Sequence, residues 1–193
     1  MEKKITMKKL FKIMLLGFFV LSVQAQAADY VIDTRGAHAG IQFKFKHIGI
    51  SWLVGRFNTF EGEFSFDEKD IANTRIVVDI DVTSLDSNHA ERDKHLRSSD
   101  FLDVSKHPTA KFVSTRIVDH GEGNVTVFGN FTMMGVTKEI AIESSMVGMG
   151  KDPWGGYRAG FEGTTTLNTK DFNLTMPPTN QVELALYIEG VRK

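Results

Sequence analysis

Apolar and polar side chains alternate along most of this chain, and this alternation restricts its fold more than any other feature. In residues 41–47 the odd positions hold isoleucine, two phenylalanines and a histidine, while the even positions hold glutamine and two lysines. Successive side chains of a β-strand point to opposite faces, so a period of two predicts strands with one buried face. The pattern recurs at 60–67, 75–82, 110–118, 123–134, 138–148, 157–168 and 180–191, with shorter stretches at 29–33 and 52–57. We therefore expect about eight to ten strands.

So many antiparallel strands in one domain must protect the unpaired backbone groups of the edge strands. Closing the sheet on itself removes these edges. The sequence therefore predicts an all-β fold, a closed antiparallel β-barrel of about eight strands. The interior of such a barrel is either packed with side chains or holds one ligand.

One hairpin is specific enough to predict its register. Residues 135–136, glycine and valine, separate two strand-like runs and suit a two-residue type II′ turn, which has glycine first. This turn would pair Met134 with Thr137 and Phe131 with Ile140. Odd positions before the turn would then share a face with even positions after it, so both apolar sets would reach the same side.

Residues 88–97 interrupt the alternation and predict one short surface helix, near 89–97. Asn88 can cap this helix, and Glu91 stands three residues later, as in a capping box. Ala90 and Leu96 are the only apolar residues of the segment, so the helix can cover little of the core. We expect it to lie as a lid over one end of the barrel and to continue into residues 100–103.

The first 27 residues have the pattern of a Sec-type signal peptide. Five lysines precede an apolar run over residues 13–23, and Ala25-Gln26-Ala27 follows as a small-x-small cleavage site. The run is shorter than the ~20 residues that span a bilayer. We expect cleavage after Ala27, export to the periplasm, and a single domain over residues 28–193.

Charge and cysteine content exclude several functions. Removing residues 1–27 takes away five lysines and one glutamate, so the net charge moves from −1 to −5. This charge does not favour binding to nucleic acid or to an anionic membrane surface. The sequence has no cysteine, which excludes disulfides, thiol catalysis, iron–sulfur clusters and zinc–thiolate sites.

The histidines and serines do not form a recognisable metal or catalytic motif. His89 and His95 are six residues apart, which places them on different faces of a helix, and His38 and His47 have opposite strand parity. Neither spacing resembles a metal site. Residues 98–100, Ser-Ser-Asp beside His95, supply hydrolase residue types without an ordered triad pattern. We expect no catalytic residue, no metal and no cofactor.

Four motifs together resemble one protein family. They are residues 88–97 with Asp100-Phe101-Leu102, Met134-Gly-Val-Thr-Lys138, Asp152-Pro-Trp-Gly-Gly-Tyr-Arg-Ala-Gly-Phe-Glu162, and His47-Ile-Gly with Trp52-Leu-Val-Gly55. On these motifs the chain resembles the YceI-like, polyisoprenoid-binding periplasmic proteins over essentially its whole exported length. The resemblance implies a lipocalin-like, extended antiparallel barrel that holds an isoprenoid lipid, either a polyprenyl phosphate or an isoprenoid quinone. One departure is Glu139, where the family motif has proline.

Two groups of candidate ligand-binding residues follow from the strand pattern and the resemblance. The inward-facing apolar positions are expected to line one continuous tail channel: Ile41, Phe43, Phe45, Phe64, Phe66, Ile80, Phe112, Phe131, Ile140, Phe161 and Leu186. Side chains able to contact a polar head group are expected at one mouth: His47, Trp52, Arg92, His95, Arg97 and Trp154. Each has a structural alternative, since phenylalanines fill ordinary cores, helix arginines face water, and His47 on the apolar face can be a buried core histidine.

The rival interpretation is an envelope interaction protein with a packed barrel. Such a protein would bind a membrane or redox partner through the helix and the loop around Trp154. As partners we expect the isoprenoid lipid and transient contact with a membrane surface or membrane protein. The sequence is compatible with a monomer or a homodimer.

Overall fold

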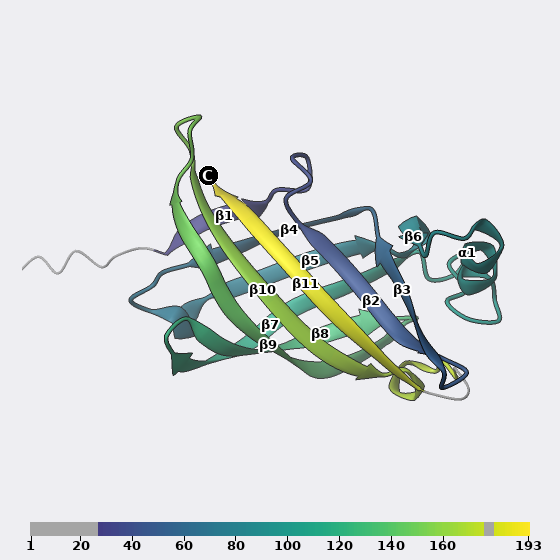
Figure 1. Ribbon diagram of the computed structural model, residues 1–193. Helices are drawn as coiled ribbons and strands as arrows, with labels where there is room; N and C mark the ends of the chain where they lie inside the picture. The colour runs from purple at the N-terminus through teal and green to yellow at the C-terminus, as the bar shows by residue number, and fades with distance from the viewer. Residues whose placement is uncertain (1–26, 176–179) are drawn as a thin grey trace, which may run out of the picture.

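Eight strands pair into a closed antiparallel ring in the computed structural model, which describes residues 27–175 and 180–193 (Figure 1). In ring order they are β1 (Ala28–Ile32), β4 (Phe60–Phe66), β5 (Arg75–Asp81), β7 (Thr109–Gly121), β8 (Asn124–Met133), β9 (Val136–Lys151), β10 (Tyr157–Asn168) and β11 (Gln181–Arg192). Hydrogen bonds between β1 and β11 close the ring. The predicted barrel is confirmed.

Three further strands extend the barrel at one end: β2 (Gly40–His47), β3 (Ser51–Phe57) and β6 (Leu85–Asp86). β11 is long enough to hold both β1 and β2 along one edge, with β1 at residues 190–192 and β2 at residues 183–187. β3 pairs with β2, and β6 adds two residue pairs to β3. The sheet is therefore longer on this side than the ring alone.

Short helices cover the two ends of the barrel. At the α1 end lie α1 (Ala90–Arg97), the β2–β3 hairpin, η2 (Val82–Ser84) and η3 (Thr169–Phe172). At the η1 end lie η1 (Ile71–Asn73), the β7–β8 turn and the β9–β10 hairpin. Figure 1 shows α1 and the β9–β10 hairpin at opposite ends of the barrel.

The helix lies where the sequence predicts it, but its cap differs. The Asp86 carboxylate accepts a hydrogen bond from the backbone N–H of Asn88 at 2.8 Å, and Asn88 adopts a left-handed conformation with φ 61°. The cap therefore moves by one residue to His89, whose Nδ1 accepts from the N–H of Arg92 at 3.2 Å. The capping box expected from Asn88 was wrong because a preceding carboxylate competes for that residue.

The predicted β8–β9 turn was wrong by one residue. The turn residues are Met134 and Gly135, with φ 50° and 75°, and Met133 pairs with Val136. Positive φ at both central positions is typical of a type I′ turn, which matches the twist of a hairpin. Phe131 consequently lies opposite residue 138 instead of residue 140. Each partner shifts by two positions, so the predicted inward faces are unchanged.

The inward faces form one apolar cluster inside the barrel, with Tyr30, Phe172 and Ala159 among the residues most fully buried. The expected signal peptide lies almost entirely outside the described residues. Within the part of the chain that the structure describes, no helix has the length and apolar character needed to cross a bilayer.

Candidate functional site

The barrel interior contains two apolar cavities that meet end to end. The larger, about 150 Å³, extends toward η1, and the smaller, about 80 Å³, lies behind α1. Both are lined by the same four residues at their junction: Ile41, Ile80, Phe131 and Leu184. The two cavities, together called the hollow below, follow each other along the barrel and adjoin at these four side chains.

The hollow is long and narrow. Ala110 lines the smaller cavity and Ile117 the larger, and these residues are separated by about 23 Å of strand β7. Both cavities are smaller than the ~300–1,000 Å³ of typical small-molecule pockets. This shape suits a thin, flexible chain better than a compact ligand.

Glycines in the barrel wall help to keep the interior open. A Cβ atom placed on Gly55 would lie 2.2 Å from Cζ of Phe43, because the phenyl ring lies directly over the glycine. A ring held against the wall leaves the centre of the barrel free. The same arrangement occurs three times: Phe43 over Gly55, Phe112 over Gly129 and Phe64 over Gly190. We did not identify these glycines from the sequence, although an inward-facing strand glycine is the available signal.

All of the residues predicted to line the channel line one or both cavities. Phe43 and Phe45 line the smaller cavity, and Phe64, Phe66 and Phe161 line the larger. These residues line two separate cavities, so a single continuous channel stays a prediction. Several lining residues that share the inward face were not among the predicted ones: Ile32, Ile76, Val78, Val127, Ile142, Met146, Leu184 and Ile188.

Among the described residues, polar groups reach the surface of the larger cavity only. Those that line the smaller cavity present an apolar surface to it, although Thr169 is one of them. In the larger, the Ser144 hydroxyl donates to the carbonyl of Glu162 and the Thr165 hydroxyl to the carbonyl of Ala141, each at 2.7 Å. The Thr74 hydroxyl is buried and, among the described residues, has no hydrogen-bond partner. An unpaired buried hydroxyl is costly and calls for an explanation.

The cavities are lined by no basic side chain from the described residues. The guanidinium groups of Arg92 and Arg97 on α1 instead donate hydrogen bonds to residues 85–87, the segment before the helix. Nε of Arg92 lies 2.7 Å from Oγ of Ser87, and Nη1 of Arg97 lies 2.7 Å from the carbonyl oxygen of Leu85. These bonds attach the helix to β6. The expected binding of a head group by these arginines therefore has no support in their geometry.

The other candidate mouth residues do not gather at one place. His47 is exposed at the end of β2, so the expectation of a buried core histidine was wrong. Trp52 lies on the outer face of β3, and Trp154 is 79% exposed in the β9–β10 hairpin. His95 is exposed, with Nε2 3.4 Å from the Asp100 carboxylate. The Ser98 hydroxyl donates to the backbone carbonyl of His95, not to its ring, so Ser98 does not form the nucleophile–base pair that the hydrolase alternative needs.

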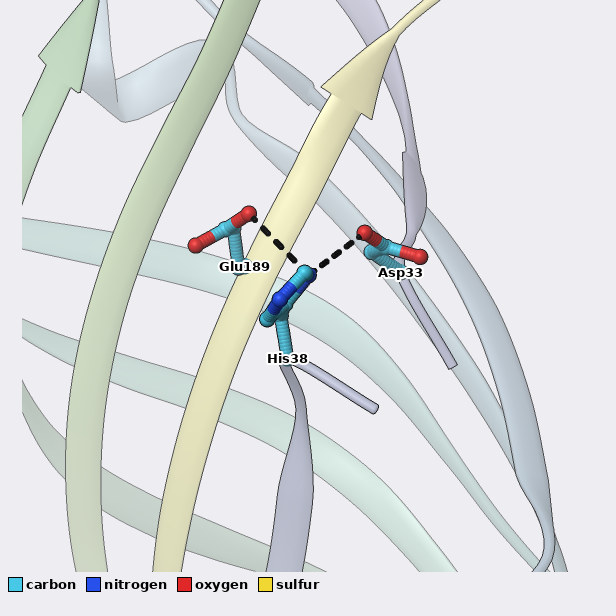
Figure 2. Close-up of side chains that lie close together, drawn as sticks. All are labelled: Asp33, His38 and Glu189. Atoms are coloured by element: carbon cyan, nitrogen blue, oxygen red, sulfur yellow. Dashed lines mark hydrogen bonds and ion pairs between the residues drawn. The ribbon is translucent and has the colours of Figure 1, made fainter. Parts of the chain in front are cut away.

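A charged cluster lies outside the cavities, near the η1 end. Nδ1 of His38 is 3.0 Å from the Asp33 carboxylate and 3.8 Å from that of Glu189 (Figure 2). The Arg158 guanidinium contacts the same two carboxylates and also that of Asp152. Hydrogen bonds from His38 and Arg158 lower the pKa of Asp33. The carboxylates of Asp33, Asp152 and Glu189 raise the pKa of Arg158, to which all three are bonded. Because the guanidinium occupies the place that a metal ion would take, the cluster is an ion-pair network that fastens the β1–β2 loop to β10 and β11.

A depression larger than either cavity lies on the outer face and has a different character. It measures about 660 Å³ and crosses β9, β10, β11 and β2. Its lining includes Lys44, Glu139, Glu143 and Glu183, and it opens to solvent. An apolar chain would gain little there, so the barrel interior is the better candidate site despite its smaller volume.

Comparisons with known proteins agree with the fold. The protein is 56% identical to a UPF0312 protein of Vibrio parahaemolyticus, over 96% of this chain and 99% of that one. A UPF0312 protein of a Shewanella species is 52% identical over the same shares. The crystal structure of BcnA from Burkholderia cenocepacia superposes with a TM-score of 0.73 at 20% identity, covering 82% of this chain and 98% of BcnA.

A second solved structure shares the architecture at lower identity. It is a polyisoprenoid-binding domain from Saccharophagus degradans implicated in plant cell wall breakdown, with a TM-score of 0.60 and 12% identity, covering 87% of this chain and all of that domain. Residues 30–190 match the model of the YceI-like domain. The chain therefore belongs to the YceI-like family.

Proposed function

We propose that this protein is a non-catalytic carrier that holds one isoprenoid lipid inside its barrel in the periplasm. The observation that carries the proposal is the elongated apolar hollow, which is kept open by phenylalanine rings lying over wall glycines. The Saccharophagus degradans domain of the same architecture is polyisoprenoid-binding, which supports the ligand class. The signal-peptide pattern of residues 1–27 supports the location.

The energetics of such a carrier favour reversible loading. Burying a methylene is worth about 0.8 kcal/mol relative to water, so a five-carbon unit gains roughly 3–4 kcal/mol. Several units would exceed any realistic affinity if water were the competitor. The true competitor is the bilayer, which surrounds the tail with similar apolar groups. The difference is therefore small, and the barrel can both take up and release its cargo.

The cavity lining favours a lipid with an uncharged polar end. A phosphate group in the hollow would lose its hydration without gaining a cation, because no basic side chain from the described residues lines either cavity. The Thr74 side chain lines the larger cavity, and its unpaired hydroxyl would donate to a quinone carbonyl or bond a terminal alcohol after rotating toward the cavity. We therefore place the polar end of the lipid near Thr74 and the tail toward α1, and we favour an isoprenoid quinone over a polyprenyl phosphate.

Identifying the lipid that the protein carries in its own host tests this proposal. The protein would be purified from the periplasm without detergent, extracted with organic solvent and analysed by mass spectrometry. We expect one isoprenoid with an uncharged head group at close to one molecule per barrel. A blank extract from folded protein would reject the carrier and favour the envelope interaction protein. An isoprenoid phosphate would reject only the placement at Thr74.

A further inference from the structure

The tip of the β2–β3 hairpin exposes an unusual amount of apolar surface. Ile50 is 81% exposed, Ile48 61% and Val54 54%, and Trp52 beside them is 46% exposed. Single exposed apolar residues are common on soluble proteins, but contiguous groups of them mark interaction sites. Four within seven residues of one hairpin form such a group.

The conformation of the turn indicates that Ile48 does not stabilise the fold. Ile48 and Gly49 have φ values of 45° and 78°, and the Ile50 N–H donates to the His47 carbonyl at 3.0 Å. Left-handed φ at both positions favours asparagine, aspartate or glycine, and a β-branched residue is strained there. Isoleucine at position 48 is thus unfavourable both for the backbone and for contact with water. A binding role for its side chain explains both costs.

The charge around the tip is locally positive although the protein is acidic. Residues 40–54, which form most of the hairpin, contain two lysines and no aspartate or glutamate. Arg56, farther from the tip, pairs with Asp86. The ammonium groups of Lys44 and Lys46 each lie 4.7 Å from the centre of the Trp52 ring. Lys44 also pairs with Glu183, whereas Lys46 has no acidic partner among the described residues. The hairpin therefore carries charge of the opposite sign to the net charge of the protein.

The hairpin also forms a wall of the smaller cavity. Phe43 and Phe45 of β2 line that cavity, and Leu53 of β3 is buried beneath the exposed face. Figure 1 shows the hairpin at the same end of the barrel as α1. A surface bound to the hairpin tip would therefore lie close to the apolar end of the hollow.

We propose that the β2–β3 hairpin tip docks on an anionic lipid bilayer. Ile48 and Ile50 enter the boundary between head groups and acyl chains, and Trp52 lies at head-group level, where tryptophan is enriched. Lys44 and Lys46 contact lipid phosphates while their stems lie on the indole ring. This docking goes beyond carriage of a lipid, because it names the surface with which the barrel exchanges its cargo.

Sedimentation of the protein with vesicles free of isoprenoid tests docking separately from cargo binding. We expect the protein without residues 1–27 to bind vesicles of phosphatidylethanolamine and phosphatidylglycerol at 3:1, and to bind phosphatidylcholine vesicles much more weakly. Ile48→Asn should lower the partition coefficient by about tenfold through lost apolar burial. It should also raise the melting temperature, because asparagine tolerates the left-handed turn. Val147→Asn, at another exposed aliphatic position on β9, is the control and should bind as the unmodified protein does.

A fluorescence measurement provides an independent readout. In a Trp154→Phe background, Trp52 reports alone, and its emission should shift to the blue on the anionic vesicles. Equal vesicle binding by Ile48→Asn and the unmodified protein would overturn the proposal. So would an absence of vesicle binding by folded protein, including the case in which the hairpin instead crosslinks to a protein partner.

Discussion

Substituting Gly55 by alanine tests whether ring-over-glycine packing keeps the barrel hollow. The new Cβ would lie 2.2 Å from Cζ of Phe43, with two more ring atoms within 2.9 Å. Ordinary carbon contacts are about 3.5–4.0 Å, so the ring must retreat by about 1.3–1.8 Å. The space available to it is the smaller cavity, of about 80 Å³. The substitution should therefore push the ring into the place of the lipid tail.

The expected stability change follows from two opposing effects. Overpacking of this kind costs about 1–3 kcal/mol. Replacing glycine by alanine also raises the free energy of unfolding by about 0.4–1 kcal/mol, because it restricts the unfolded chain. We therefore expect Gly55→Ala to lower the free energy of unfolding by about 1–2 kcal/mol. Gly148→Ala is the matched control, because a Cβ there meets no atom within 4 Å, and it should stabilise slightly.

Two assays separate the effects on stability and on binding. Urea unfolding followed by circular dichroism gives the free energies, and displacement of a fluorescent prenyl probe by geranylgeraniol gives the affinity. Gly55→Ala should bind geranylgeraniol more weakly, and adding Phe43→Leu should restore binding by making room for the Cβ. The reasoning is refuted if Gly55→Ala and Gly148→Ala change stability in the same direction and bind geranylgeraniol equally well.

Three other substitutions test different parts of the account. Phe131→Trp, where the two cavities adjoin, should reduce the amount of lipid carried more than it reduces stability. Solvent extraction measures the lipid and thermal melting the stability. An amount of lipid equal to that of the unmodified protein would count against the hollow. Thr74→Val should stabilise the lipid-free protein by about 1 kcal/mol and weaken geranylgeraniol binding by about 3–10-fold. The binding of an isoprenoid hydrocarbon, which has no hydroxyl group, should not change. Equal losses of affinity for both ligands would show that the Thr74 hydroxyl plays no part in binding. Asp33→Asn should destabilise the fold most above about pH 4, since a pKa lowered by folding gives stability that disappears as pH falls through the folded value. Parallel urea titrations at pH 7 and pH 2 would measure this difference, and an equal loss at both pH values would contradict it.

The period-two pattern was enough to predict the barrel and its inward faces. It assigned Phe43, Phe131 and Phe161 to the interior because facing depends only on parity along a strand, which a shifted turn leaves unchanged. Turn and cap positions were less predictable. Gly135 suits either position of a two-residue hairpin turn, and the left-handed φ of Met134 has no sequence signal.

The mouth of the site could not be predicted, because its features depend on contacts between distant segments. Arg97 has the residue type that binds phosphate, yet its guanidinium donates to a carbonyl of β6, a partner that only the fold supplies. The ring-over-glycine pairs depend on strand register, as between Phe43 and Gly55, which is known only once β2 and β3 are paired. The unpaired hydroxyl of Thr74 likewise becomes visible only when its surroundings are counted.

The most direct test of the central claim is to locate a bound isoprenoid chain by nuclear magnetic resonance. Protein with ¹³C-labelled methyl groups would be mixed with geranylgeraniol, and nuclear Overhauser contacts from the ligand would be recorded. We predict contacts to the methyl groups of Ile80 and Leu184, where the two cavities meet. Contacts confined to Val54 in the outer groove, with Ile80 and Leu184 unaffected, would contradict a lipid held inside the barrel.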